Sequence, residues 1–431
     1  MKKPARILVA LITLLNLAVV SAQEWTRFRG PNGTGIGHGL KLPEQLTEKN
    51  VNWKIELPGI GHSSPVLWGE EIFLTCAGDK AGGISVLCFG FRTGKTEWKR
   101  DFSLTPFPRH RFNSYASATP AVDSERVYVV WNEPDHYFLT ALDHRGKTVW
   151  QRDFGVFVSQ HGCGASPIVC DDKLILTDFQ DDQKFVEGPT PDERNGTSSI
   201  IAVEARTGKT VWQIPRKSTV VAYSTPCLYE PKEGKSALIF NSQSHGISAL
   251  DPASGKVLWE YERAFNRRSV SSPLIAGNLI FGSCGSGAGG NVLTAIKAGD
   301  ANSGHKPELA YQLKKSAPYV PTGVVVGDLM WLWSDGGIVT CLRAASGEVS
   351  YQERVGGDFF GSPVYADGRL YCVSTSGELI SIEASDHFKV LGRFALNELC
   401  RSTPAIAKGQ LVVRTEKHLW CLGPAPEPIR P

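Results

Sequence analysis

A serine or threonine followed by proline recurs along the chain at nearly even intervals. The copies are Ser64–Pro65, Thr119–Pro120, Ser166–Pro167, Thr225–Pro226, Ser272–Pro273, Ser362–Pro363 and Thr403–Pro404, and Thr322–Gly323 stands where an eighth is due. Their mean spacing is about 48 residues, a period typical of repeated β-sheet units. Because one repeat covers most of the chain, each unit must be a small sheet that buries its faces against its neighbours.

Each unit has the pattern of four short strands. After the proline come an apolar run, a polar turn, a second apolar run and a third, and then a glycine turn leads to a strand with an aromatic residue. The clearest copies of the last part are ALDHRGKTVW at 141–150, AVEARTGKTVW at 202–212 and ALDPASGKVLW at 249–259, with weaker forms at 88–98 and 341–351. Glycine there supplies a positive φ for a tight turn. We predict that the tryptophan covers the interface with the next unit, a structural role given to Trp53, Trp98, Trp150, Trp212 and Trp259.

Eight such units predict an all-β protein, an eight-bladed β-propeller of four-stranded antiparallel blades. The last unit, from Cys400 to Leu422, stops after its third strand. We expect Val51–Leu57 to supply the missing fourth strand and so to close the ring, which removes exposed sheet edges. The predicted organisation is a leader at 23–50 that packs on the propeller, the propeller at 51–423, and a proline-rich tail at 424–431.

The first residues have the pattern of a secretory signal peptide. Lys2, Lys3 and Arg6 precede an apolar run at 7–20, and cleavage is expected after Ala22. The run is short for a membrane span, and no later stretch approaches about 18 apolar residues. We therefore expect an exported, monomeric protein of the periplasm or the extracellular space. Without the three basic residues of the signal, 43 basic residues face 43 acidic ones, which argues against a general nucleic-acid binder.

Ten cysteines in an exported chain raise the question of disulfides. Cys88, Cys341 and Cys421 occupy the repeat position that holds alanine in other units, so they are expected to act as small buried apolar residues. One or two disulfides remain open, and the sequence does not pair them. There is no CxxC or CxxCH pattern, so neither a zinc ribbon nor an attached haem is indicated.

The tryptophan-terminated unit, repeated around an eight-bladed ring, resembles the PQQ-like β-propeller family, which includes quinoprotein alcohol dehydrogenases and the outer-membrane assembly factor BamB. The segment at 25–31, WTRFRGP, followed by Gly33, Gly35 and Gly37, looks like the leader of an exported, haem-free subgroup. The resemblance implies the fold for nearly the whole mature chain. It says less about chemistry, because one fold carries many functions.

The resemblance also implies what an enzyme of this family would need, namely PQQ, a calcium ion held by Glu, Asn and Asp, and two adjacent cysteines beside the quinone. No two cysteines here are adjacent, and no motif maps onto the calcium ligands residue by residue. These differences favour a non-catalytic binding or scaffold protein with a protein, peptide or small anionic ligand. A PQQ- and calcium-dependent oxidoreductase with a degenerate site is the alternative.

Residues just before each Ser/Thr-Pro step should converge at one mouth of the ring, because the chain enters every inner strand there. The candidates for ligand binding are His62, Arg109, Arg111, Asn113, Tyr115, His161, Tyr223, Arg267, Arg268, Tyr319, Asp358 and Arg401. Arginines gathered at one mouth suit an anionic or carboxylate-bearing group. The alternative is a merely polar surface in which the arginines pair with Asp358 and Glu398.

Two further segments bear on the site. The insertion at 180–197 is long and acidic, and Asp181 and Asp182 head its candidate oxygen ligands for a hard cation. A solvated acidic lid on the face of the mouth is the preferred interpretation. GSGAGG at 285–290 matches a dinucleotide-binding pattern, but a strand-like run follows instead of a helix, so it is predicted to be a turn between the second and third strands of its blade.

Overall fold

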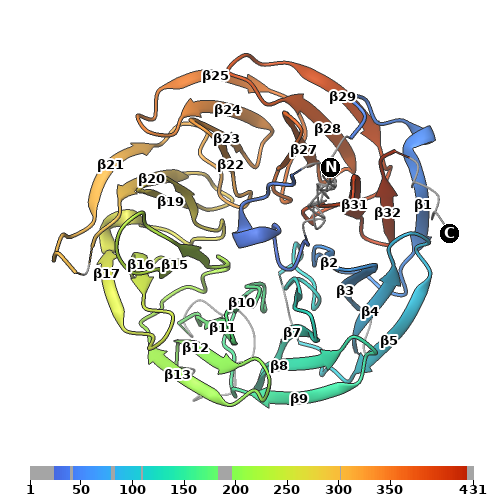
Figure 1. The fold of residues 1–431 in the computed structure, drawn as a ribbon, viewed down its shortest axis with the longest axis horizontal. Coiled ribbons are helices and arrows are strands. Elements are labelled where there is room, and N and C mark those ends of the chain that lie inside the picture. The colour runs from blue at the N-terminus through green and yellow to red at the C-terminus, as the bar shows by residue number, and fades with distance from the viewer. Residues whose placement is uncertain are drawn as a thin grey trace, which may run out of the picture.

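The structure is a computed structural model that describes residues 24–38, 42–78, 83–107, 110–182, 197–300 and 302–424. Eight antiparallel sheets of four strands stand around a central axis as the blades of a propeller (Figure 1). The predicted fold is therefore confirmed. In every blade, strand order in the sheet follows the order in the chain, except in the blade that holds both chain ends.

The first four blades follow one another along the chain. Blade 1 consists of β2 (Val66–Trp68), β3 (Glu71–Ala77), β4 (Ile84–Gly90) and β5 (Thr96–Phe102). Blade 2 consists of β6 (Ala121–Val122), β7 (Arg126–Glu133), β8 (His136–Asp143) and β9 (Thr148–Asp153). Blade 3 consists of β10 (Ile168–Cys170), β11 (Lys173–Asp178), β12 (Ser199–Glu204) and β13 (Thr210–Pro215). Blade 4 consists of β14 (Cys227–Tyr229), β15 (Ala237–Ser242), β16 (Gly246–Leu250) and β17 (Val257–Tyr261).

The other four blades complete the circle. Blade 5 consists of β18 (Leu274–Ala276), β19 (Leu279–Cys284), β20 (Val292–Lys297) and β21 (Glu308–Leu313). Blade 6 consists of β22 (Val324–Val326), β23 (Leu329–Trp333), β24 (Ile338–Arg343) and β25 (Val349–Arg354). Blade 7 consists of β26 (Val364–Ala366), β27 (Arg369–Val373), β28 (Glu378–Glu383) and β29 (Val390–Ala395). Blade 8 consists of β30 (Ala405–Ala407), β31 (Gln410–Arg414), β32 (His418–Leu422) and β1 (Val51–Glu56). Short 3₁₀ turns occur at η1 (Pro31–Gly33), η2 (Glu48–Asn50) and η4 (Glu262–Ala264).

Blade 8 joins the two ends of the propeller, as the sequence predicts. Strand β1 runs antiparallel to β32, with Trp53 opposite Cys421 and Glu56 opposite His418. The backbone N–H of Gly423 donates to the carbonyl of Asn50 at 2.9 Å. The blue β1 and the red β32 lie side by side in Figure 1. This pairing covers the edge of β32 that would stay open if blade 8 had only its three C-terminal strands.

Indole rings join blade 8 to blade 1 and each of blades 1 to 3 to the blade that follows it. In blade 2, Ala141 lies opposite Trp150, and a β-bulge follows at once. The indole N–H of Trp150 donates to the carbonyl of Ala205 in blade 3 at 3.0 Å. The ring rests on Gly208, whose φ of 71° no other residue type adopts readily. Corresponding indole-to-carbonyl bonds join Trp53 to Phe91, Trp98 to His144 and Trp212 to Pro252. Trp259 of blade 4 lies against Gly299 of blade 5, so the five tryptophans lie at the blade interfaces where the sequence predicts them.

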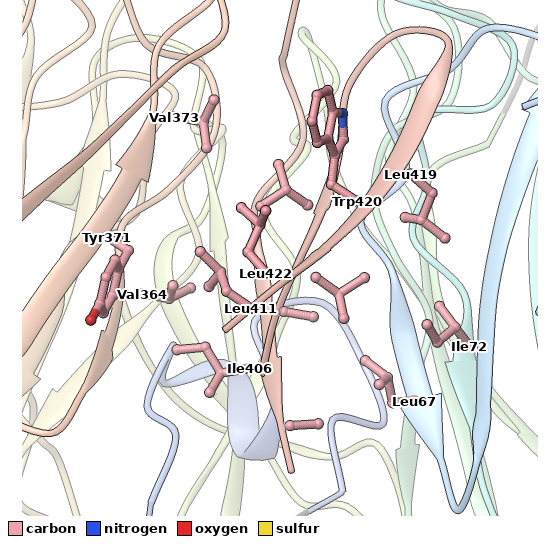
Figure 2. Packing of buried hydrophobic residues seen from close by; sticks show 14 of the residues in the cluster. Leu67, Ile72, Val364, Tyr371, Val373, Ile406, Leu411, Leu419, Trp420 and Leu422 are labelled. Carbon is pink, nitrogen blue, oxygen red and sulfur yellow. The ribbon is translucent and has the colours of Figure 1, made fainter. Parts of the chain in front are cut away.

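The apolar core fills the spaces between neighbouring blades. Figure 2 shows part of the cluster shared by blades 7, 8 and 1, in which Val364, Leu411 and Ile72 are fully buried. The alanine-like position is filled by buried thiols in three blades, where Cys88 faces Trp98, Cys341 faces Tyr351 and Cys421 faces Trp53. All ten cysteines are buried and free.

The leader crosses one end of the central channel. Trp25 is fully buried, and its carbonyl accepts a bond from Leu67 of blade 1. Farther along, Ile36 forms a parallel bridge to Tyr365 of blade 7. The guanidinium of the fully buried Arg29 donates to the carbonyls of Gly33, Thr34, Thr322, Gly323 and Pro363. This dark blue segment is seen at the centre of the ring in Figure 1.

Candidate functional site: the mouth of the ring

The Ser/Thr-Pro steps form a closed ring of hydrogen bonds around the axis. The backbone N–H of each Ser or Thr donates to the side-chain hydroxyl of the next step, and Thr403 N–H closes the circle on Ser64 Oγ at 3.0 Å. The eight bonds measure 2.9–3.4 Å and run through Ser64, Thr119, Ser166, Thr225, Ser272, Thr322, Ser362 and Thr403. Each repeat therefore needs a hydroxyl at this position, because the hydroxyl oxygen accepts a hydrogen bond from a backbone N–H of the neighbouring step.

A cavity of about 940 Å³ opens above this ring. Seven of the eight hydroxyl-bearing residues line it, and Phe28 of the leader also contributes to the wall. The rest of the wall comes from the loops that lead into the inner strands and from the turns between second and third strands. Both sets lie on the same face, because a chain that enters at the mouth returns to it after two strands.

One side of the cavity carries a belt of aromatic and imidazole rings. Ring centroids lie 5.5 Å apart for Phe360 and Phe112, 5.2 Å for Phe112 and His110, 4.6 Å for His110 and His161, and 6.1 Å for His161 and Tyr223. These residues come from the entrances of four different blades. The belt gives the mouth a flat apolar wall of the kind that holds rings or extended side chains.

Arg401 lies at one end of the belt. Its guanidinium is 5.0 Å from the ring centroid of Phe112 and 5.6 Å from that of Phe360, and its Nη1 lies 3.5 Å from His62 Nε2. Its Nε is buried and has no hydrogen-bond partner. Within the described residues, no carboxylate lies within 4 Å of this side chain. Burial lowers the pKa of Arg401, and the charge of Glu416 partly offsets that effect.

Arg268 lies at the other end and has a carboxylate partner. Its Nη2 lies 3.2 Å from Oδ1 of Asp181, and its guanidinium is 5.7 Å from the ring centroid of Tyr223. The side chain of Asp181 is fully buried and also accepts bonds from the backbone N–H groups of Gln160 and Val221 at 2.7 Å. Asp181 therefore positions Arg268, and its oxygens are already occupied.

The two histidines of the aromatic belt are held in the neutral form. Burial, together with the charges of Arg268 and His110, lowers the pKa of His161 to about 3. Burial and the charges of Arg111, Arg268 and Arg401 lower the pKa of His110. Both imidazoles are consequently neutral at pH 7 and present hydrogen-bonding nitrogens and ring faces. The positive potential of these arginines would stabilise an anion bound in the mouth.

Two carboxylates from blades 6 and 7 complete the wall. Asp335 accepts bonds from the backbone N–H groups of Tyr319 at 2.7 Å and Val320 at 3.0 Å. Burial raises the pKa of Asp335, and the charge of Asp358 contributes to the rise. Asp358 is exposed, and within the described residues nothing donates to its carboxylate. The two acidic side chains therefore differ, since only Asp358 has both oxygens open to a ligand.

Eight of the twelve residues predicted for the mouth line the cavity: His62, Asn113, His161, Tyr223, Arg268, Tyr319, Asp358 and Arg401. Three others do not. Arg111 is exposed and stacks over Phe112, and Arg267 is exposed and donates to Ser286 Oγ at 3.1 Å. Tyr115 turns into the protein, where its hydroxyl donates to the carbonyl of Phe107 at 2.6 Å. Arg109 lies outside the described residues.

The pairing predicted for a merely polar mouth is absent at Arg401. Glu398 accepts from the hydroxyl of Thr415, the backbone of Lys417 and the ring of His418 at 2.6–2.7 Å, so it is occupied elsewhere. Of the acidic insertion, residues 180–182 and 197 are described, and the backbone N–H of Asp182 donates to the carbonyl of Thr219. Residues 183–196 lie outside the described residues. Whether the insertion covers the mouth stays a prediction.

Sequence reasoning missed a second group of lining residues. Ser286 and Asn291 come from the turn of blade 5, Asp335 from that of blade 6, and Thr375 from that of blade 7, all between the second and third strands. The GSGAGG segment is thus a turn, as predicted, and it also borders the cavity. Tracing the antiparallel blade from the mouth would have placed these turns on the same face. No sequence pattern indicated Phe28, which reaches the cavity from the leader.

The fold, its tryptophan-terminated repeat and the ring of hydroxyls define a PQQ-like β-propeller. The family described as outer membrane protein assembly factor BamB matches residues 82–353 and 312–387. These segments cover well over half of the chain, so the protein belongs to this family. Among curated proteins, none matches the sequence.

Solved structures agree on the fold. BamB from Moraxella catarrhalis is 14% identical, with a TM-score of 0.59 over 86% of this chain and 96% of that one. The quinohemoprotein alcohol dehydrogenase from Comamonas testosteroni is 12% identical, with a TM-score of 0.63 over 95% of this chain and 82% of that one. The computationally designed Ika8 protein also matches, with a TM-score of 0.57, 9% identity, and coverage of 85% of this chain and 98% of that one. At these identities the likeness concerns the fold alone.

Proposed function

We propose that the protein is a non-catalytic binding or scaffold protein of the periplasm or cell envelope, and that its mouth binds an anionic group of its ligand or partner. The observation that carries this proposal is Arg401, a half-buried guanidinium between two phenyl rings with no carboxylate partner among the described residues. A buried cation without a counter-ion is costly, and an incoming carboxylate offsets that cost through charge-assisted hydrogen bonds.

Membership of the BamB family supports a binding role in the envelope. The description of that family names an assembly factor of outer membrane proteins, and we infer a binding role from that description. The predicted signal peptide agrees with this location but lies outside the described residues. Within the residues that the structure describes, no helix has the length and apolar character to cross a membrane.

The residues present at the mouth do not fit PQQ with calcium. Calcium prefers six to eight oxygen ligands. Asp335 and Asp181 already accept backbone N–H groups or an arginine, which leaves Asp358 as the one open carboxylate among the described lining residues. No group of three or more His, Cys, Asp or Glu side chains suited to a metal occurs in the described ranges. The closest cysteines in sequence, Cys163 and Cys170, are both buried and free.

The test compares the mature chain with an Arg401→Gln variant. Citrate, succinate and inorganic phosphate are titrated by calorimetry, and binding of at least one of them is expected to weaken roughly tenfold or more in the variant. Arg393→Gln removes a guanidinium on the outer strand of blade 7, so it serves as the matched control. Equal binding by the Arg401→Gln variant would refute the proposed role of the mouth.

A second titration addresses the oxidoreductase alternative. The mature chain is mixed with PQQ in the presence and absence of calcium, and absorbance, melting temperature and reduction of a dye by alcohols are followed. We expect no calcium-dependent binding and no dye reduction. Saturable, calcium-dependent binding of PQQ with turnover of an alcohol would overturn the non-catalytic proposal.

A further inference from the structure

Two opposite charges that have no ion-pair partner among the described residues face the same cavity from neighbouring blades. Arg401 precedes the inner strand of blade 8, and Asp358 precedes that of blade 7. Neither forms an ion pair with the other or with another charged group among the described residues. An exposed ion pair contributes little to stability, so the two charges remain available to a ligand within one cavity.

The surroundings explain why the two charges stay apart. Backbone bonds fix the loop of Asp358, since Phe359 N–H donates to the Asp335 carbonyl at 2.8 Å and Thr375 N–H donates to that of Asp358 at 2.7 Å. Phe360 comes two residues after Asp358 and packs against Arg401. The segment that carries the carboxylate of Asp358 thus also carries the ring of Phe360, which lies beside the guanidinium of Arg401. A rigid loop and an aromatic side chain keep an anion site and a cation site distinct within one cavity.

Other candidate acceptors and donors in this part of the wall are already engaged. Asp335 is occupied by two backbone N–H groups, and Glu398 by three donors from blade 8. Arg268 is neutralised by Asp181 at the far end of the belt. Among the described residues of this wall, Arg401 and Asp358 are therefore the two charges that a ligand can engage without first breaking an ion pair.

The apolar wall beside these charges is open to a ligand. Phe112 is 38% exposed, which is unusual for a phenylalanine, and its ring lies 5.5 Å from that of Phe360. The volume of about 940 Å³ is near the upper limit of pockets that enclose drug-sized molecules. The space is thus larger than one amino acid needs and suits a chain of a few residues.

We propose that the ligand of the mouth is a short peptide with both termini free. Its α-carboxylate lies against Arg401, an aromatic or large apolar side chain packs on Phe112 and Phe360, and its α-ammonium group faces Asp358. This inference rests on the proposed function, because it takes the mouth as the binding site. It adds a second, oppositely charged subsite, which a simple anion binder would not need.

The experiment uses the full mature chain and peptides that differ only at their ends. The probes are Phe, Gly-Phe, Gly-Gly-Phe and Gly-Gly-Gly-Phe, which vary the distance between the charges, and calorimetry identifies the tightest. That peptide is then compared with its C-terminally amidated and N-terminally acetylated forms. Each change is expected to weaken binding about tenfold or more, as for the loss of one charged hydrogen bond.

Two variants assign each terminus to its subsite. In Arg401→Gln, amidation of the peptide should no longer matter, whereas acetylation still should. In Asp358→Asn, acetylation of the peptide should no longer matter, whereas amidation still should. Unchanged circular dichroism and melting temperature would show that both variants fold, and Asp386→Asn on the outer surface of blade 7 serves as the control for Asp358. This crossed design measures coupling between partners and not the mere loss of a charge.

The outcomes separate this inference from the proposed function. If acetylation has no effect while amidation and Arg401→Gln both weaken binding, the mouth is an anion site and the peptide inference is wrong. If no carboxylate probe binds, or binding ignores Arg401→Gln, the proposed function itself fails. Equal effects of amidation in the wild type and in Arg401→Gln would also refute the assignment of the carboxylate.

Discussion

Asp178 is a buried acid whose cost to the fold changes with pH. It ends strand β11 and is 3% exposed, and its Oδ1 accepts a bond from Gln180 Nε2 at 3.1 Å. Burial raises its pKa from 3.8 to about 7, and the bond from Gln180 offsets only part of the rise. Well below its ordinary pKa of 3.8, the carboxyl is protonated in both the folded and unfolded states. As the pH rises toward 7, only the unfolded state gives up its proton, so the folded state loses stability.

We expect Asp178→Asn to stabilise the protein at pH 8, by about 1–3 kcal/mol in the free energy of unfolding, because it removes a buried charge. The gain should shrink as the pH is lowered through the range between the two pKa values and vanish only below about pH 3. Urea unfolding of both proteins from about pH 3 to pH 8 measures it. A difference that does not change with pH would show that the charge of Asp178 is not its source.

At the residue scale, the sequence indicated which side chains reach the mouth but not how they are paired. Arg268 and Arg401 both precede a Ser/Thr-Pro step or its equivalent, so they have the same pattern. The structure gives Arg268 a buried carboxylate and leaves Arg401 without one. That difference arises from Asp181, some 90 residues away from Arg268 in the chain, and a pattern within one repeat carries no information about such a partner.

At the scale of elements, the staple between blades depends on a glycine under each indole. A Cβ built on Gly208 would lie 2.7 Å from Cε3 of Trp150. The backbone there also has a φ of 71°, which disfavours any other residue. Gly277 has a similar φ of 61° in the turn of blade 5, yet nothing lies within 4 Å of a Cβ at that position.

These two glycines form a matched pair of variants. Gly277→Ala should cost only the backbone strain, about 1 kcal/mol, whereas Gly208→Ala should cost roughly 1–3 kcal/mol more because the indole must shift. Urea unfolding of the two variants and the wild type measures the difference. Equal losses would mean that the tryptophan contact contributes nothing at this interface.

The strands could be predicted from the sequence because their pattern repeats. The contacts of the leader could not, because its sequence occurs only once. Repeated copies of the Ser/Thr-Pro step and of the tryptophan motif indicate the strands, the glycine turn and the tryptophan contact, since each copy reduces the ambiguity of the others. The leader at 24–38 has no copy to compare. Its central contacts, such as Arg29 with the carbonyls of Thr322 and Pro363, join residues about 300 positions apart. Local propensity does not encode contacts of that kind.

At the scale of the whole molecule, closure decides whether the ring is one cooperative unit. Strand β1 is the only strand of blade 8 from the N-terminal side, and it packs Trp53 on Gly94 of blade 1. Without it, β32 would expose an unpaired edge, and the interface between blades 8 and 1 would lose its staple. Neighbour contacts dominate stability in repeat proteins, so one broken interface loosens both of its blades.

Two rearranged chains test the role of β1 apart from that of the leader. The first spans residues 58–424 and lacks both. The second is the same chain with residues 51–57 appended after Pro424, where Val51 can form a hairpin with β32, since Val51 already lies opposite Leu422. We expect the first chain to lose its cooperative thermal transition and the second to recover it. The first chain melting like the full protein would show that the ring holds without closure, and failure of both chains would assign the stability to the leader and its buried Arg29 instead.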